Sequence, residues 1–228
     1  MSDFHCSMGS PASTLHSMAS SGTLFLNVMD FSGTAVFAAT GVLASTRKRM
    51  DLVGAVALAL VTATGGGTLR DLLTGQTPVF WIRQPIYIWV AIAAALLTFA
   101  LVWRMPAPKN YLLIPDAIGL ALYTWLGCVK AHLLGLPDTS VVLMGVVTGI
   151  AGGIIRDVLS AEVPFIFLKG ELYAAASLPG AIALVICWHL GLGELPSAAI
   201  CMAIVLAIRL AAIRWNIHLP SYSGKTGK

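Results

Sequence analysis

Residues 65–71, with the sequence GGGTLRD, recur 86 residues later as residues 151–157, with the sequence AGGIIRD. The same spacing keeps further residues in register without a gap: Asp30 with Asp116, Gly33 with Gly119, Gly41 with Gly127, Thr62 with Thr148, Pro78 with Pro164, Arg83 with Lys169 and Tyr87 with Tyr173. Chance does not keep so many Asp, Gly, Pro and Tyr residues aligned. The chain is therefore an internal duplication, which in hydrophobic proteins is typical of membrane transport.

The composition predicts an integral membrane protein. Of the 228 residues, 57% are hydrophobic and 11% are charged, whereas soluble domains carry about 25% charged residues. The mean hydropathy is +0.85, and the apolar residues form long runs, which favours the lipid bilayer as solvent. The formal net charge is +4, but the basic residues are scattered at the ends of these runs. We therefore expect membrane lipid, and no nucleic acid, as a partner.

The cysteines and histidines show no pattern of an enzyme or a metal protein. They form neither a Cys-x-x-Cys pair nor a ligand-spaced cluster: Cys6, Cys128, Cys187, Cys201, His5, His16, His132, His189 and His218. No Ser/His/Asp or Cys/His catalytic arrangement is recognisable either. We predict no disulfide, no metal, no cofactor and no enzymatic activity.

Seven apolar spans can be placed along the chain, at residues 24–45, 52–69, 86–104, 111–131, 139–155, 172–190 and 195–213. Three spans belong to each copy of the duplication and the last stands alone. An odd number of spans forces the second copy to enter the membrane from the opposite face. The predicted fold is an all-α integral membrane protein, with seven transmembrane helices arranged as two inverted three-helix repeats plus one C-terminal helix.

The segment boundaries follow from these spans. Residues 1–23 are rich in Ser, Met and Gly and lack Lys and Arg, so we interpret them as a flexible polar tail and not as a signal peptide. The remaining segments are the first repeat at 24–110, the second at 111–194, the seventh helix at 195–214 and a cytoplasmic tail at 215–228.

The distribution of basic residues predicts the orientation. With the N-terminus outside, the cytoplasmic segments hold 11 of the 14 Lys and Arg residues: Arg47, Lys48, Arg49, Arg104, Lys109, Arg156, Lys169, Arg209, Arg214, Lys225 and Lys228. The outer segments hold Arg70, Arg83 and Lys130. Because positive charge is retained inside, we expect the C-terminus in the cytoplasm.

The repeated glycine block lies deep in the membrane in both copies. Thirteen residues separate Leu52 from Gly65 and Thr139 from Gly152, or about 20 Å of helix in a hydrocarbon core of about 30 Å. Consecutive glycines are poor helix formers, so we expect both helices to break there and to expose carbonyls that suit a dehydrated cation. The predicted hinge residues are Gly65, Gly66, Gly67, Gly152 and Gly153. The alternative is that these small residues only permit close helix packing.

Charged residues flank both glycine blocks. Arg70, Asp71, Arg156 and Asp157 follow the glycines, and Asp30 and Asp116 lie five or six residues into the first and fourth spans. Intramembrane charges are costly and often mark a transport pathway, so we place Asp30 and Arg70 together in the outer half and Asp116 and Arg156 together in the inner half. The alternatives are surface Arg–Asp couples and aspartates that only cap a helix start. Lys130 and His132 have no counterparts in the first copy, and we expect them to be solvated.

The two segments GGGTLRDLLTGQTPVF and AGGIIRDVLSAEVPFIF, each in a three-span repeat before a seventh span, resemble the bacterial branch of the trimeric intracellular cation (TRIC) channels. Such sequences are also described as glycine-transporter-like membrane proteins. The resemblance covers residues 24–213. It implies a homotrimer in the bacterial inner membrane, with one pore in each protomer. The pore would be lined by the kinked second and fifth spans and would conduct monovalent cations, mainly potassium. Ala151 replaces the first glycine of the second block, which implies a stiffer kink there.

The sequence therefore favours a potassium-preferring cation channel. Two other classes stay open. A secondary transporter of a small amino acid such as glycine could use the same broken helices, with one half-helix end for the carboxylate and another for the ammonium group. A non-conducting structural protein is disfavoured by the charges inside the membrane.

The orientation can be checked by labelling. We expect a cysteine introduced at position 10 to react with a membrane-impermeant maleimide added from the periplasmic side, and one introduced at position 48 to stay unlabelled until the membrane is opened. The reverse pattern would invert the assigned topology.

Overall fold

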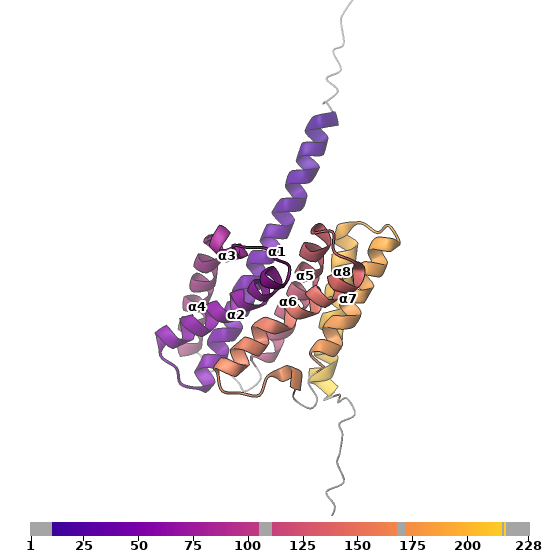
Figure 1. Cartoon of the computed structure of the whole chain (residues 1–228). Helices are drawn as coiled ribbons and strands as arrows, with labels where there is room; N and C mark the ends of the chain where they lie inside the picture. The colour runs from indigo at the N-terminus through magenta and orange to yellow at the C-terminus, as the bar shows by residue number, and fades with distance from the viewer. Residues whose placement is uncertain (1–10, 105–110, 168–171, 216, 218–228) are drawn as a thin grey trace, which may run out of the picture.

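The computed structural model describes residues 11–104, 111–167, 172–215 and 217, and throughout these stretches every regular element is helical (Figure 1). The elements are α1 (Pro11–Arg47), α2 (Leu52–Leu73), α3 (Phe80–Arg83), α4 (Ile86–Arg104), α5 (Leu113–Leu133), α6 (Asp138–Leu159), η1 (Phe165–Phe167), α7 (Ala174–His189) and α8 (Glu194–Trp215). Several predicted segments lie outside the described residues: 1–10, the tail at 218–228, Lys109, Lys169, Lys225 and Lys228.

Local signals set the ends of these helices. The Asp51 carboxylate accepts a hydrogen bond of 2.8 Å from the amide of Gly54, which caps the first turn of α2. Beyond the C-terminal ends of α2 and α5 stand Gly75 and Gly135, with φ of 69° and 71°. Glycine adopts this left-handed conformation without steric cost, so the chain can reverse direction at both places.

Within the described residues, six helices are long and apolar enough to cross a membrane: residues 24–47 of α1, together with α2, α4, α5, α6 and α8. The apolar helix α7 has only 16 residues, with Pro179 inside it. In Figure 1, α1 begins at one end of the bundle and α8 ends at the other. Six spans are therefore evident by length, and α7 is the short helix at the position of the predicted sixth span.

The bundle is centred on α5. Of the residues in its most apolar window, 72% are buried, compared with 17% for α4. Figure 1 shows α4 on one side of the bundle and α7 and α8 on the other, with α1, α2, α5 and α6 between them. Phe37, Ala59, Tyr123, Trp125 and Val141 contribute to the core between these four central helices.

The start of α1 corrects the prediction for the N-terminal tail. The helix begins at Pro11, so residues 11–23, which we expected to be flexible, are helical. Proline suits the first turn of a helix, and neither Gly nor Pro follows until Gly22. Helix α1 has 37 residues and is about 55 Å long. Figure 1 shows its first part extending beyond the bundle.

The predicted break at the glycine blocks is wrong. Helix α2 runs unbroken through Gly65, Gly66 and Gly67, and α6 runs unbroken through Gly152 and Gly153. All five glycines are buried, so the neighbouring helices supply the packing that outweighs the low helix propensity of glycine. The blocks therefore release no run of backbone carbonyls for ions.

The glycines instead allow α2 and α6 to cross at very short range. A Cβ atom added to Gly66 would lie 2.2 Å from the Thr148 carbonyl oxygen, and one added to Gly152 would lie 2.6 Å from the Thr62 carbonyl oxygen. Gly66 corresponds to Gly152 in the duplication, and Thr62 corresponds to Thr148. The two copies therefore make the same contact with each other, in reciprocal directions. Close packing, which was our alternative, is what these two glycines provide.

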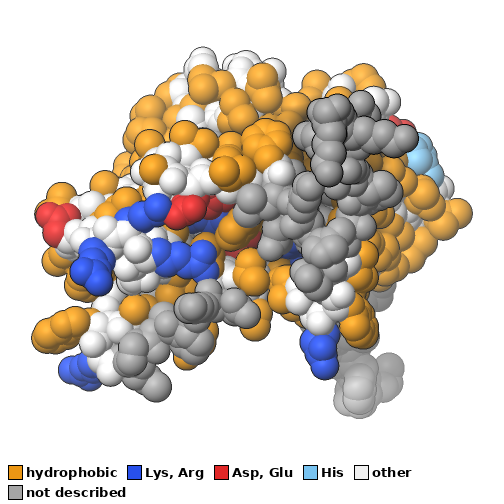
Figure 2. Space-filling view, turned by 90° about the horizontal axis from the view of Figure 1, so that it is seen from below, with side chains coloured by type: hydrophobic (Ala, Val, Ile, Leu, Met, Phe, Trp, Pro, Cys, Tyr) orange, Lys and Arg blue, Asp and Glu red, His pale blue; other side chains and the backbone are white. Residues whose placement is uncertain are grey.

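Ion pairs between loops show which helix ends lie on the same side. Lys48, after α1, lies 2.5 Å from the carboxylate of Glu162, after α6, and its hydrogen bond lowers the pKa of that carboxyl group. His189, at the end of α7, lies 2.7 Å from Asp138, at the start of α6. Figure 2, seen from below, shows Lys and Arg side chains at several places on this face among hydrophobic side chains, with acidic side chains beside some of them. These pairings agree with the predicted order of crossings.

A matched pair of substitutions tests the close crossing. We expect Gly66→Ala to lower the free energy of unfolding by about 1–3 kcal/mol, because its Cβ would meet a backbone oxygen that cannot move alone. Gly65→Ala in the same block meets only the end of the Ile155 side chain, at 2.8 Å, and should be nearly neutral. Unfolding of both variants in detergent, followed by circular dichroism, provides the measurement. Equal stability of the two variants would contradict the crossing.

Candidate functional site

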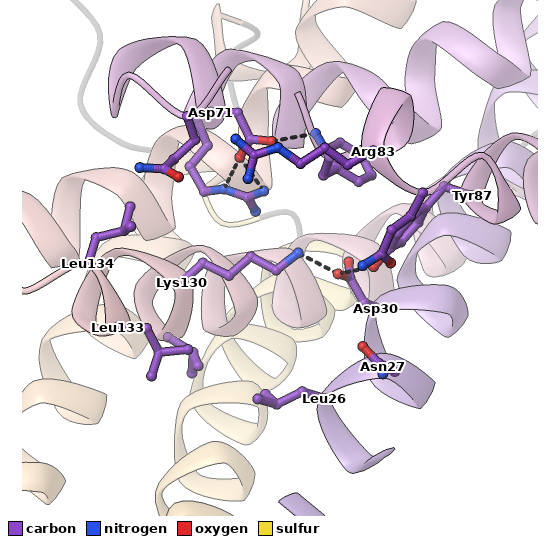
Figure 3. Close-up of a pocket in the computed structure, with 14 residues that line it drawn as sticks. Leu26, Asn27, Asp30, Asp71, Arg83, Tyr87, Lys130, Leu133 and Leu134 are labelled. Carbon is purple, nitrogen blue, oxygen red and sulfur yellow. Dashed lines mark hydrogen bonds and ion pairs between the residues drawn. The ribbon is translucent and has the colours of Figure 1, made fainter. Parts of the chain in front are cut away.

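One group of buried charges gathers where α1, α2, α4 and α5 meet, and we call it the first cluster: Asp30, Arg70, Asp71, Tyr87 and Lys130. Asp30 is 3% exposed although it lies far inside α1. Its carboxylate accepts a hydrogen bond of 2.7 Å from the Tyr87 hydroxyl and a short one from the Lys130 ammonium group. Figure 3 shows Lys130 and Tyr87 reaching Asp30 from different helices. The carboxylate is thus paired and hydrogen-bonded, as a buried charge must be.

Arg70 and Asp71 form the second half of the first cluster. The Arg70 guanidinium donates two hydrogen bonds, of 2.6 and 3.0 Å, to one oxygen of Asp71. The other oxygen of Asp71 accepts a bond of 2.8 Å from the backbone amide of Phe80, at the start of α3. The Asp71 carboxylate therefore binds the Arg70 guanidinium with one oxygen and the first backbone amide of α3 with the other.

The aromatic ring of Phe80 lies near the cations of both halves of this cluster. The Lys130 ammonium nitrogen lies 5.5 Å from the ring centroid, and the Arg70 guanidinium carbon lies 5.9 Å from it. Both cations are thus within the range of attraction to an aromatic face. The ring also contacts Tyr87 edge-on, with 4.8 Å between centroids. Phe80 is therefore a neighbour that Lys130 and Arg70 share.

A cavity of about 330 Å³ opens beside the first cluster. Asp30, Arg70, Asp71 and Lys130 line it, and Arg83 lies at its rim together with polar and leucine side chains (Figure 3). The lining contains three basic and two acidic side chains. Because the cavity carries both signs with an excess of positive charge, a free cation is not favoured there while Lys130 stays bound to Asp30.

A corresponding group lies where α5, α6, α7 and α8 meet, and we call it the second cluster: Asp116, Arg156, Asp157, Tyr173 and Arg209. Arg156 and Asp116 are fully buried. The Arg156 guanidinium donates a hydrogen bond of 2.6 Å to Asp116 and one of 2.8 Å to Asp157. Arg156 therefore bridges both carboxylates, whereas the one carboxylate that Arg70 bonds among the described residues is that of Asp71.

Aromatic groups complete the second cluster as they do the first. The Tyr173 hydroxyl donates to Asp116 at 3.1 Å, and the amide of Phe165 donates to Asp157 at 3.1 Å. The guanidinium carbon of Arg156 lies 5.2 Å from the centroid of the Phe165 ring. That of Arg209, on α8, lies 4.9 Å from the centroid of the Tyr173 ring. The second cluster thus contains two carboxylates and two guanidinium groups in a sealed site.

The structure brings together most of the predicted charged residues. Asp116 and Arg156 are in direct contact, and Asp30 and Arg70 line one cavity without bonding to each other. Asp30 is not a helix cap, since it lies well inside α1, and its side chain bonds to Tyr87 and Lys130. The Arg–Asp pairs are buried and are not surface couples. The predicted hinge glycines are neighbours of the clusters and not part of them.

Sequence reasoning missed the fourth charge of each cluster. Lys130, which we expected to be solvated, pairs with Asp30, because the end of α5 lies against α1. His132 is exposed as expected, and its ring stacks on Trp188 with 4.5 Å between centroids. Arg209, counted among the cytoplasmic loop charges, is fully buried in α8. Tyr87 and Tyr173 could have been found from the sequence, because they are in register next to the repeated charges.

Comparison with known proteins assigns the chain to a family. The family model described as Glycine transporter matches twice, at residues 27–103 and 113–189, which are 86 residues apart and therefore carry the duplication. A UPF0126 membrane protein of Vibrio cholerae is 43% identical, over 88% of this chain and 84% of that protein. The UPF0126 inner membrane protein YadS of Escherichia coli K12 is also 43% identical, over 86% of this chain and 95% of that protein.

Solved structures agree with this assignment. The TRIC trimeric intracellular cation channel orthologue from Rhodobacter sphaeroides is 36% identical, with a TM-score of 0.81 over 85% of this chain and 99% of that one. A prokaryotic TRIC channel determined in 0.5 M KCl is 27% identical, with a TM-score of 0.78 over 86% of this chain and 100% of that one. The chain is thus a membrane protein of the glycine transporter (UPF0126) family, which is the bacterial branch of the TRIC channels.

Proposed function

We propose that this protein is a monovalent cation channel that prefers potassium, with one pore in each protomer of a homotrimer. The likeness to solved TRIC cation channels supports conduction of cations and a trimeric assembly. The feature of the chain that carries the proposal is the pair of corresponding charge clusters. Buried charges at two mirrored positions along α2 and α6 are costly to maintain and mark a pathway.

The duplication suggests how the two clusters are placed in the membrane. We propose that seven spans cross it, with α7 as the sixth, and that the two repeats have inverted topology. The reciprocal contacts of Gly66 and Gly152 at the crossing of α2 and α6 support a two-fold axis between the copies. The first cluster then lies in the outer half and the second in the cytoplasmic half.

The pathway we propose runs from the cavity at the first cluster, past the crossing of α2 and α6, to the second cluster. Because the helices are unbroken, side chains and not freed carbonyls would replace the water around the ion. Asp30 is the carboxylate that borders the cavity and is held by a flexible lysine. When Lys130 leaves it, the cavity gains a negative site, and a cation can take the place of the ammonium group.

The alternative function is transport of a small amino acid such as glycine. One observation favours it, since the cavity presents acidic and basic side chains together and is large enough for a small zwitterion. Because α2 and α6 are unbroken, they provide no half-helix ends of the kind that would bind the carboxylate and ammonium groups of an amino acid.

Recording from purified protein in planar bilayers distinguishes the two. A channel gives unitary currents, with a reversal potential that follows a potassium gradient. A glycine transporter gives saturable, coupled glycine uptake in liposomes and no unitary current. Glycine uptake without current would refute the channel.

Removing the lysine should increase cation entry. We expect Lys130→Met to raise the cation current, because it frees the Asp30 carboxylate while keeping an unbranched side chain of similar length. The double variant Asp30→Asn with Lys130→Met should return the current to or below the original level. Bilayer recording of both variants, with size-exclusion chromatography as the assembly control, provides the comparison. An unchanged current in Lys130→Met would remove this residue from the pathway.

The two arginines should differ in what they contribute. Arg156→Ala leaves Asp116 and Asp157 without their partner in a sealed site, so we expect a loss of about 3–5 kcal/mol in stability. Arg70→Ala leaves Asp71 beside an open cavity, so we expect a smaller loss and an altered flux in a protein that still assembles.

The control for this pair is Arg83→Ala, at the cavity rim, where the guanidinium bonds only to the Thr77 carbonyl oxygen among the described groups. It should cost about 1 kcal/mol or less. Thermal unfolding and potassium flux from liposomes measure both quantities. Normal stability and flux in Arg70→Ala and Arg156→Ala would exclude both pairs from the pathway.

A further inference from the structure

Two aromatic rings meet in the core of the bundle. Phe37, on α1, and Tyr123, on α5, are 1% and 2% exposed, and their ring centroids lie 4.9 Å apart. They occupy corresponding positions of the duplication, since they are 86 residues apart. The two copies therefore place one ring each at the same depth, and the rings differ by one hydroxyl group.

Each ring occupies space that a glycine of the other copy leaves free. A Cβ atom added to Gly33 would lie 3.2 Å from the Tyr123 ring, and one added to Gly119 would lie 2.1 Å from the Phe37 ring. Gly33 and Gly119 also correspond to each other. A second glycine, Gly152, lies against Phe37 at the crossing of α2 and α6, where an added Cβ would be 3.0 Å from the ring. The rings therefore fill the middle of the bundle.

On the side of the first cluster, polar groups continue inward from Asp30. The Thr34 hydroxyl donates to the Asp30 carbonyl oxygen at 2.9 Å and lies 3.0 Å from the Tyr123 hydroxyl. The Tyr123 hydroxyl also donates a long hydrogen bond of 3.4 Å to the Ala63 carbonyl oxygen. An ion that leaves the first cluster would meet oxygen atoms at each of these steps.

On the side of the second cluster, the corresponding positions carry no side-chain oxygen. Thr34 is replaced by Leu120, Tyr123 by Phe37 and Ala63 by Gly149. Leu120 is fully buried and packs in one apolar cluster with Tyr173. The side chains at these three positions are therefore apolar, whereas two of their counterparts carry a hydroxyl group. The buried hydroxyl group of Thr124 lies against Gly149 and has no hydrogen-bond partner among the described residues.

We propose that Phe37 and Leu120 form a hydrophobic gate on the second-cluster side of the pathway, and that Tyr123 and Thr34 are the hydroxyl groups that carry the cation up to it. This inference rests on the proposed channel function and names the residues that set its barrier. A constriction lined only by apolar groups loses its water and stops ions although no charge opposes them. A cation that has exchanged water for the hydroxyl oxygens of Thr34 and Tyr123 meets the apolar side chains of Phe37 and Leu120 at the corresponding positions of the other half.

The duplication suggests the test, because the hydroxyl-bearing residues on the first-cluster side can be introduced at the corresponding positions on the second-cluster side. The variants Phe37→Tyr and Phe37→Tyr with Leu120→Thr give the second half the residue pair of the first half. We expect their potassium current in planar bilayers to be at least about fivefold higher than that of the original chain, the factor that one net hydrogen bond supplies. Tyr123→Phe removes a single oxygen atom and should lower the current by about the same factor.

A matched control adds a hydroxyl to another packed aromatic ring of the bundle. Phe99→Tyr, on α4, changes a partly buried ring of the same core without touching the ring pair, and its current should equal that of the original chain. Each variant is checked for assembly by size-exclusion chromatography. If Phe37→Tyr fails to assemble, the current of Tyr123→Phe still tests the proposed gate, because this substitution adds no atom to the core.

The failures can be told apart. If the original chain carries no cation current, the proposed channel function is refuted, and this gate with it. If the original chain conducts and Tyr123→Phe conducts equally well, the hydroxyl group has no part in permeation and the inference alone is overturned. A current in the Phe37→Tyr variants that does not exceed that of Phe99→Tyr overturns it as well.

Discussion

The close crossing of α2 and α6 is the constraint on which the rest of the structure depends. Gly66 and Gly152 bring each helix against a carbonyl oxygen of the other, and no larger residue fits at either place. This approach holds the two copies together at their centre and fixes where the following charges lie. Arg70 and Asp71 leave the crossing towards one end of the bundle and Arg156 and Asp157 towards the other, so each cluster forms where its helix ends.

Both clusters stabilise buried charges by pairing them, but the first cluster borders a cavity and the second is more completely buried. Each holds two carboxylates, two cations and a tyrosine hydroxyl, because a buried charge is tolerated only when it is paired and hydrogen-bonded. In the second cluster Arg156 binds both carboxylates and seals the site. In the first cluster, Lys130 and not the arginine bonds to the buried aspartate Asp30, and Arg70 bonds to Asp71. The cavity lies on the side where a flexible ammonium group holds the carboxylate.

The sequence predicted the membrane class and the duplication, and it placed Asp116 and Arg156 in the same half of the bundle. Long apolar runs and the register between the two copies can both be read from the order of the residues alone. It failed at the glycine blocks, where low helix propensity suggested a break and packing against Thr62 and Thr148 kept the helix intact. It also failed for Lys130 and Arg209, whose partners lie on helices distant in the sequence. Tertiary packing determines which basic side chain pairs with a given carboxylate, and the spacing of residues along the sequence does not predict it.

The reciprocal contact at the crossing has a consequence for the origin of the chain. The same two residue types, a glycine and a threonine carbonyl, make the contact from both sides, so the face that joins the copies is complementary to itself under a two-fold rotation. A single three-helix unit with such a face could pair with an identical unit inserted upside down.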